Sequence, residues 1–274
     1  VVRLLVGRTD WRQVDPEPIV RRRRAGQLVR AAGREYARNP LVFLLTGAVY
    51  LPALVVTGAL TAIVQLIPFV SAIIGLAGKA SGTSLFLSVF VGSVSNAAAF
   101  ITVNAVVAVY LRDERRGVPA AIDALRAAWE HRRALVGAFG RSFVIVFVLL
   151  ASFVGAPWGI RQLVRYQFVA QAVMYEERDG RSALARSSEL VRGRWFHTAL
   201  VTGALNSAGG FIGLLVALIL LVVASSIPLW VFSMLVSLVY AVLVPFAALA
   251  MALLYGDAVA EQQGAEQADP VPVG

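Results

Sequence analysis

Long runs of apolar residues are separated by short charged segments along this 274-residue chain. An uncharged apolar run of more than about 18 residues is typical of a transmembrane helix. A helix also satisfies its own backbone hydrogen bonds, which a segment in hydrocarbon must do. The pattern therefore predicts an all-α fold and a polytopic integral membrane protein.

Six spans are predicted, and they pair into three helical hairpins. They cover approximately residues 41–67, 84–111, 135–154, 158–175, 198–223 and 229–255. Pro52 lies inside the first span and is expected to kink it. The segment 68–82 is too short to cross again, so we interpret it as an interfacial or re-entrant piece.

The distribution of basic residues predicts the orientation of these spans. The net charge is +9, and Lys79 is the single lysine among the 25 basic residues. Ten arginines precede the first span, six lie in residues 112–133 and five in residues 178–194. Arginine-rich connections stay in the cytoplasm. We therefore expect a multi-pass protein of the cytoplasmic (plasma) membrane with both termini inside. Arg21–Arg24 fits this topology signal and contact with acidic lipid better than nucleic-acid binding.

The end of a hairpin recurs three times. AVYLRDERRG, AVMYEERDG and ALLYGDAVAEQQG each carry a tyrosine (Tyr110, Tyr175, Tyr255), then charged or polar residues, then glycine. Each hairpin also follows an arginine-rich amphipathic segment. This predicts three hairpins with cytoplasmic amphipathic helices, although chance similarity between apolar spans is an alternative. The predicted divisions are a flexible basic segment 1–27, a six-helix domain 28–260 with repeats 28–117, 118–180 and 181–260, and a flexible tail 261–274.

The third amphipathic segment is expected to lie in the membrane interface. Ser182 is the expected N-cap, and Leu184 and Val191 share one helical face with the tryptophan that follows. Arginines on such a helix would reach anionic lipid headgroups. The alternative is an ordinary helical connector. The predicted lipid contacts are Arg186, Arg192, Arg194 and Trp195.

Polar residues inside the third and fourth spans are the strongest candidates for a ligand site. They are Arg161, Arg165, Gln167, Gln171 and Arg141. Arg165 lies ten residues before Tyr175, about 15 Å along a continuous helix, which is near the middle of a core of about 30 Å. A guanidinium there suits an anion or phosphate headgroup. The alternatives are a polar network with backbone carbonyls and with asparagine or glutamine side chains such as Asn96, Asn104 and Asn206, or a fourth helix that is shallow, tilted and hydrated.

Enzyme chemistry is not predicted. Cysteine is absent, and His131 and His197 have no carboxylate or second histidine at ligand spacing, so we expect neither a metal nor a cofactor. No acidic residue lies inside a predicted span, which disfavours a proton-coupled pump. Gly209 and Gly213 form a GxxxG pair that is typical of helix packing in membranes.

One stretch carries a family resemblance. YQFVAQAVMYEERDGRSALARSSELVRGRW, from Tyr166 to Trp195, and a later ALLYGD resemble the six-span membrane domain attached to some bacterial glycerophosphodiester phosphodiesterases. Stand-alone prokaryotic membrane proteins share this domain. The likeness covers residues 28–264 and implies a fold, whereas it implies no activity. The matching residues are Ala183, Leu184, Ser187, Leu190, Gly193, Trp195, Tyr255 and Asp257; Gly256, Ala258 and Val259 depart from the pattern.

These observations predict a non-enzymatic inner-membrane scaffold or a partner subunit of a membrane assembly. Its candidate partners are membrane lipids and either a second protein or another copy of the chain. The alternative is a transporter, channel or lipid-handling protein with an anionic ligand near Arg161 and Arg165. A membrane enzyme built on Glu176, Glu177 and Asp179 is the least favoured, because neighbouring arginines neutralise these acids.

Overall fold

The computed structural model describes residues 19–20, 23–52, 55, 59, 80–113, 117–223 and 229–268. Within these residues the chain is helical and has no strand, so the predicted all-α class is confirmed. The elements are α1 (Ala25–Arg38), α2 (Pro40–Gly47), α5 (Ala80–Arg112), α6 (Val118–Glu130), α7 (Arg132–Ala151), the 3₁₀ turn η2 (Phe153–Gly155), α8 (Ala156–Arg165), α9 (Val169–Glu176), α10 (Gly180–Val191), α11 (Trp195–Val223) and α12 (Leu229–Ala268).

Three helical segments are long and apolar enough to cross a membrane. They are Val94–Arg112 in α5, Arg132–Ala151, which is α7, and Leu238–Gly264 in α12. The apolar helix Pro40–Pro52 is shorter. The chain is therefore that of a membrane protein. About half of the predicted first span and residues 68–79 of the 68–82 segment lie outside the described residues, whereas residues 80–82 are the start of α5.

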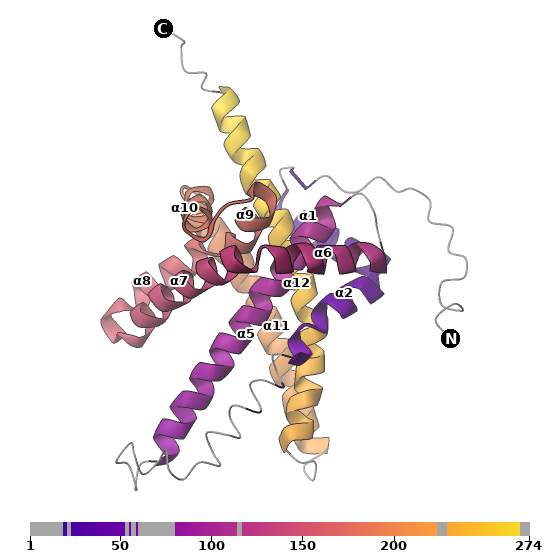
Figure 1. Cartoon of the computed structure of the whole chain (residues 1–274), viewed down its shortest axis with the longest axis vertical. Coiled ribbons are helices and arrows are strands. Elements are labelled where there is room, and N and C mark those ends of the chain that lie inside the picture. Colours follow the sequence, from indigo (N-terminus) through magenta and orange to yellow (C-terminus); the bar gives the residue numbers. More distant parts are fainter. Residues whose placement is uncertain are drawn as a thin grey trace, which may run out of the picture.

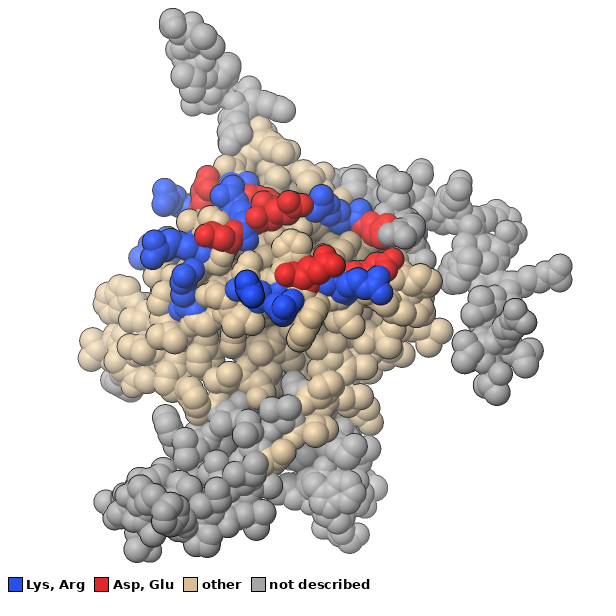
Figure 2. All heavy atoms as spheres, in the orientation of Figure 1, with Lys and Arg blue, Asp and Glu red and all other residues tan. Residues whose placement is uncertain are grey.

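Helices α11 and α12 run along the length of the molecule, and α5 slants away from them (Figure 1). Helices α1, α6, α9 and α10 gather around one end of this bundle, whereas α7 and α8 project to its side. We call this end the charged end, because acidic and basic side chains form a band across it (Figure 2). Helix α12 is central, since it contacts α1, α2, α5, α10 and α11.

The predicted fourth span is not one continuous helix. Helix α8 has ten residues and is about 15 Å long, half of a hydrocarbon core of about 30 Å. A turn at residues 166–168 then separates it from α9. Ser187 of α10 stabilises this break, because its hydroxyl accepts a hydrogen bond from the Phe168 N–H (3.1 Å) and donates one to the Arg165 carbonyl (2.6 Å). A side chain from a later helix thus replaces hydrogen bonds that a continuous helix would make.

The predicted sixth span ends later than expected. Helix α12 continues past Tyr255 to Ala268, so residues 261–268 are helical rather than part of a flexible tail. Pro245 lies inside α12 and is buried.

Glycines let neighbouring helices come close to α12. A Cβ on Gly213 would lie 2.9 Å from the Tyr240 hydroxyl oxygen, whereas one on Gly209 meets nothing within 4 Å. Only one glycine of the GxxxG pair therefore packs closely.

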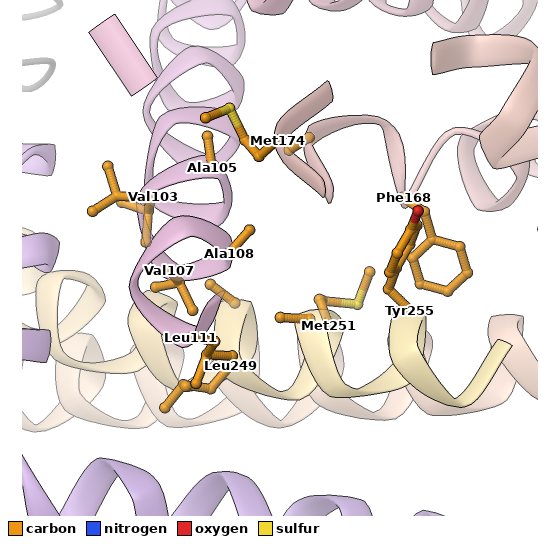
Figure 3. Close-up of a cluster of buried hydrophobic side chains, with 14 of the residues drawn as sticks. Val103, Ala105, Val107, Ala108, Leu111, Phe168, Met174, Leu249, Met251 and Tyr255 are labelled. Carbon is orange, nitrogen blue, oxygen red and sulfur yellow. The ribbon is translucent and has the colours of Figure 1, made fainter. Parts of the chain in front are cut away.

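The densest part of the core lies near the charged end. Small and medium side chains of α5 face α9 and α12 there (Figure 3). Alanines allow these helices to approach one another closely. Helix α9 is buried along most of its length, from Val169 to Met174. The labelled members of the cluster are Val103, Ala105, Val107, Ala108, Leu111, Phe168, Met174, Leu249, Met251 and Tyr255.

Candidate functional site

A cavity of about 920 Å³ lies between α5, α7, the α8–α9 turn, α11 and α12. These helices form a ring, because α5 contacts α12, α12 contacts α11, α11 contacts α8, α8 contacts α7, and α7 contacts α5. Helix α9 packs against α5 and α7 and contributes Val169 and Ala170 to the wall. The volume falls within the range of small-molecule sites, about 300–1,000 Å³.

The wall of this cavity is apolar and uncharged. Phe100, Phe139, Phe143 and Phe246 supply aromatic surface, and leucine, isoleucine and valine side chains fill most of the remainder. No lining residue among those described is acidic, basic or a histidine. The polar lining residues are Tyr50, Asn96, Asn104, Ser142, Tyr166, Gln167, Asn206 and Tyr240. The cavity therefore suits a ligand that is mostly apolar and carries uncharged hydrogen-bonding groups.

The cavity extends along α5. Asn96 and Asn104 both line it and are eight residues apart, about 12 Å along the helix axis. Asn104 is the nearer of the two to the charged end, where α5 finishes at Arg112. Tyr50 lies beside Asn96 and donates a hydrogen bond to its carbonyl (3.4 Å). Polar groups are thus present at both ends of an apolar chamber.

A buried amide pair lies at the end of the cavity nearer the charged end. Gln171 is fully buried, and its side-chain N–H donates to the Asn104 side-chain oxygen at 3.1 Å. The Asn104 amide in turn donates to the Phe100 carbonyl at 2.8 Å. The Gln171 side-chain oxygen has no partner among the described residues. Buried amides are normally hydrogen-bonded, and here the bond between them joins α9 to α5.

The two arginines predicted near the membrane centre do not line the cavity. Arg161 is exposed on α8, and Arg165, its last residue, is half-buried. The Trp195 indole donates to the Arg161 carbonyl (3.4 Å), and α10 bonds to the Arg165 carbonyl. Both arginines therefore lie beside α10 and the start of α11. The predicted depth of about 15 Å for Arg165 assumed one continuous helix from Arg165 to Tyr175. The turn at residues 166–168 interrupts that helix, so the prediction does not hold.

The other predicted polar residues are separated from one another. Gln167 and Asn104 line the cavity, whereas Gln171 lies behind the wall, where it donates to Asn104. Arg141 is exposed on α7. Hydrogen bonds from Ser182 are the main cause that lowers the pKa of Asp179, and the positive charge of Arg141 adds to them. The structure therefore brings Gln167 to the cavity and places Arg141, Arg161 and Arg165 outside it.

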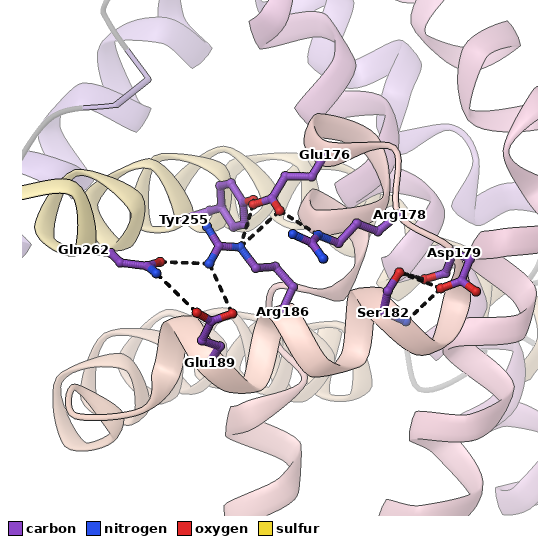
Figure 4. Close-up of polar contacts among 8 residues, drawn as sticks. All are labelled: Glu176, Arg178, Asp179, Ser182, Arg186, Glu189, Tyr255 and Gln262. Carbon is purple, nitrogen blue, oxygen red and sulfur yellow. Dashed lines mark hydrogen bonds and ion pairs between the residues drawn. The ribbon is translucent and has the colours of Figure 1, made fainter. Parts of the chain in front are cut away.

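A cluster of ionic and hydrogen-bonding groups joins α9, α10 and α12 at the charged end (Figure 4). We call it the Glu176 cluster; it comprises Glu176, Arg178, Arg186, Glu189, Tyr255 and Gln262. The Glu176 carboxylate accepts from Arg178 Nε (2.7 Å), from Arg186 Nε (2.8 Å) and from the Tyr255 hydroxyl. Arg186 also pairs with Glu189 (3.3 Å) and donates to Gln262 (2.8 Å).

These contacts set the protonation of Glu176. Burial opposes ionisation of the carboxyl, but hydrogen bonds from Tyr255, Arg186 and Arg178 outweigh it and hold the pKa of Glu176 below its usual value. Burial also disfavours the charged form of Arg186, yet Glu176 and Glu189 raise its pKa further. Both groups are charged at neutral pH, which makes the cluster a structural tie rather than an acid–base centre.

A second ion pair anchors α11 to the far part of α12. Arg194 pairs with Asp257 and with Glu261 (2.7 Å). The backbone N–H of Arg23 donates to the same aspartate (2.7 Å). The pair is largely removed from solvent, since the Arg194 side chain is 9% exposed and that of Asp257 is 7% exposed.

The predicted lipid contacts are thereby divided. Arg186, with a side chain 15% exposed, and Arg194 point at carboxylates of their own chain instead of toward solvent or lipid. Arg192 is exposed and Trp195 is half-buried. The N-cap of α10 also differs from the prediction, because Asp179 accepts the Ser182 N–H (2.8 Å) and Ser182 is the third residue of the helix. The sequence singles out Glu176 as an acid beside arginines and Asp257 as a motif residue, but it does not show which distant helices they meet.

Comparison of the chain with protein-family models, curated proteins and solved structures finds no match. The resemblance to the phosphodiesterase-associated membrane domain therefore rests on its motifs. Several residues of those motifs have tertiary roles, since Ser187 stabilises the α8–α9 break, Tyr255 binds Glu176 and Asp257 binds Arg194. In the part of the chain that the structure describes, no group of three or more His, Asp or Glu residues is placed to hold a metal.

Proposed function

We propose that this protein is a non-enzymatic, multi-pass membrane protein that binds an uncharged, lipid-like molecule in the cavity. The observation that carries the proposal is the partly open cavity of about 920 Å³, whose wall of described residues, from Tyr50 to Ala247, carries no charge. The proposal includes six spans in the cytoplasmic membrane and a charged end that faces the cytoplasm. The arginine-rich connections support this orientation.

The polar lining residues indicate how such a ligand is selected. Apolar surface alone gives little preference over bulk lipid, because lipid tails are as apolar as the wall. A polar group without a partner is costly inside a membrane. Within the described residues, the Gln167 side chain and the Tyr166 hydroxyl make no hydrogen bond to protein. A hydroxyl or carbonyl on the ligand would satisfy them, so an uncharged amphiphile is favoured over a plain hydrocarbon.

An anionic ligand near Arg161 and Arg165 is less well supported. Neither arginine lines the cavity, and Arg161 is exposed. An anion inside the cavity would lose its hydration without gaining a cationic partner. Of the alternatives expected from the sequence, we therefore keep lipid handling. The sequence suggested an anionic ligand, whereas the cavity favours an uncharged one.

A cavity-filling variant tests the proposal. Gly209 lines the cavity and has nothing within 4 Å of an added Cβ, so Gly209→Leu projects into the chamber without a backbone clash. Gly140→Leu is the matched control, because Gly140 is equally open but lies outside the wall. Each protein would be crosslinked in native membranes to a photoactivatable diacylglycerol and to a photoactivatable phosphatidylglycerol.

We expect the wild type and Gly140→Leu to crosslink to diacylglycerol, and Gly209→Leu to lose most of this labelling. Equal labelling of all three proteins would contradict an intramembrane site. Labelling by phosphatidylglycerol that Gly209→Leu abolishes would restore the anionic-ligand alternative.

The scaffold function expected from the sequence is the second candidate. The Glu176 cluster and the Arg194 pair favour it, because they join α9, α10 and the start of α11 to α12. The test is the mass of the protein extracted with its native lipids. A complex well above the 29.3 kDa chain mass supports assembly, whereas a monomer contradicts it.

A further inference from the structure

Helix α6 has three distinct faces. Its buried face consists of alanines, Ala120, Ala121, Ala124 and Ala128, and the helix contacts α2, α5 and α7. A second face carries the charged residues Asp123, Arg126 and Glu130. The third face is apolar and uncovered. An amphipathic helix in a globular protein normally packs its large apolar residues against the rest of the protein. The described residues of this chain do not cover the apolar face of α6, so a partner outside these residues must cover it.

The uncovered face is a continuous stripe, formed by Val118, Ile122, Leu125 and Trp129. Their spacing of four, three and four residues places them on one side of the helix. Their exposed fractions lie between 41% and 68%, and Trp129 is the most exposed. We call this face the α6 stripe. It is far more regular than the scattered exposed apolar residues of an ordinary surface.

The position of α6 indicates what covers the stripe. The helix connects the charged end of α5, at Arg112, with the start of α7, at Arg132, and both neighbours are candidate membrane spans. It runs across the end of the bundle rather than along α12 (Figure 1). The exposed apolar surface continues directly into α7 at Val136. The stripe is therefore level with the place where two spans leave the membrane.

The ends of the stripe match the chemistry of the lipid headgroup layer. The Arg132 guanidinium lies 5.2 Å from the centre of the Trp129 ring and donates to the Trp129 carbonyl (3.1 Å). Arg126 and Arg133 are also exposed. Tryptophan is enriched at the membrane interface, and arginines close to it attract anionic headgroups. A water-soluble protein partner would not explain the continuity with the span surface.

We propose that α6 is an interfacial helix whose stripe inserts into the cytoplasmic leaflet of an anionic bilayer, with Arg126, Arg132 and Arg133 at the phosphates. Such a helix lies in the plane of the membrane with its apolar face buried about 5–10 Å into the interface. It would fix the depth of the α5–α7 connection independently of any ligand in the cavity. The sequence predicts interfacial lipid contact for the segment that forms α10, and we place this contact on α6 instead.

Spin labels can test this inference directly, because the chain has no cysteine. Leu125→Cys places a nitroxide on the stripe, and Glu130→Cys places one on the charged face as the matched control, at a residue that is not assigned to the phosphates. Both native side chains are exposed, so neither change disturbs the core. Each variant would be reconstituted in phosphatidylcholine with and without phosphatidylglycerol, and the accessibility of the label to oxygen and to a water-soluble nickel chelate would be measured.

We expect the oxygen-to-nickel accessibility ratio to be several-fold higher at position 125 than at position 130. We also expect the ratio at position 125 to rise when phosphatidylglycerol is added. Equal, water-like ratios at both positions would overturn the proposal. An immobile label at position 125 that neither reagent reaches would also overturn it, and would indicate that another protein surface covers the stripe. If the ratio at position 125 did not change when phosphatidylglycerol was added, the proposed contact between the arginines and anionic headgroups would be wrong.

Discussion

Helices α6 and α10 occupy equivalent places in the chain, since each follows a charged edge and precedes a long apolar helix. Their faces are used in opposite ways. Helix α10 buries large apolar residues such as Leu184 and Leu190, and its Arg186 binds carboxylates of the same chain. Helix α6 buries only alanines and leaves its large apolar residues uncovered. Amphipathicity therefore identifies a helix at a boundary, whereas neighbouring side chains decide what lies against its apolar face.

The glycine at the start of each helix shows the same contrast. Gly117 has φ +101° and ψ −172°, a backbone conformation that is essentially restricted to glycine. Gly180 is needed for space, because an added Cβ would lie 2.8 Å from the Ala138 nitrogen and 3.0 Å from the Gly137 carbonyl carbon. One glycine shapes a turn, and the other lets α10 pack directly on the backbone of α7.

The largest expected difference between the two helices concerns their leucines. Leu190→Ala removes a buried side chain of α10 and should lower the free energy of unfolding by about 2–5 kcal/mol. Leu125→Ala on the α6 stripe should change it in detergent by less than about 0.5 kcal/mol. Unfolding of both variants in mixed micelles would be compared. Similar losses would mean that the stripe is packed against protein.

The next effect concerns the carboxylate that holds α10. Glu176→Gln removes the charge that binds Arg178 and Arg186, and it should cost roughly 1.5–3 kcal/mol of stability. Glu177→Gln is the adjacent control. Its side chain is 71% exposed, and its ion pair with Arg112 is long, at 4.0 Å. Loss of this carboxylate should therefore cost less than about 1 kcal/mol. Equal unfolding midpoints for the two variants would show that the cluster contributes no stability.

A smaller loss is expected from crowding at the start of α10. Gly180→Ala forces backbone atoms of α7 to move and should cost about 1–3 kcal/mol, toward the lower end if α7 can shift. Gly140→Ala, also on α7, meets nothing within 4 Å and should be neutral or slightly stabilising. Thermal unfolding of the two variants decides this. A neutral Gly180→Ala would mean that α10 is loosely attached.

Acid should weaken α10 more than α6, because the Asp123–Arg126 ion pair of α6 is exposed. The pKa of Glu176 is lower in the folded protein than its usual value of 4.5. Its contribution is therefore present above pH 4.5 and lost as pH falls through the folded pKa. Hydrogen exchange of α10 amides relative to α6 amides should rise in this range for the wild type and change less for Glu176→Gln. An identical pH response of both proteins would assign the loss to other groups.

Local sequence features determined the helical class, the three apolar helices long enough to cross a membrane, and the amphipathic segments that precede α2, α7 and α11. Each of these depends on residues within a few turns of one another, so periodicity and hydropathy reveal them. The GxxxG pair also lies in one helix, yet the tertiary structure decided that Gly213 packs against Tyr240 and Gly209 lines a cavity.

Only the tertiary structure decided the break after Arg165, the inward pairing of Arg186 and Arg194, and the cavity. The break depends on Ser187, 22 residues away, and the Arg194–Asp257 pair joins residues 63 apart. The cavity wall combines segments from Tyr50 to Ala247. An arginine has the same local pattern whether its partner is a phosphate or a carboxylate from a distant helix. Its partner is settled only when folding brings that helix within hydrogen-bond distance.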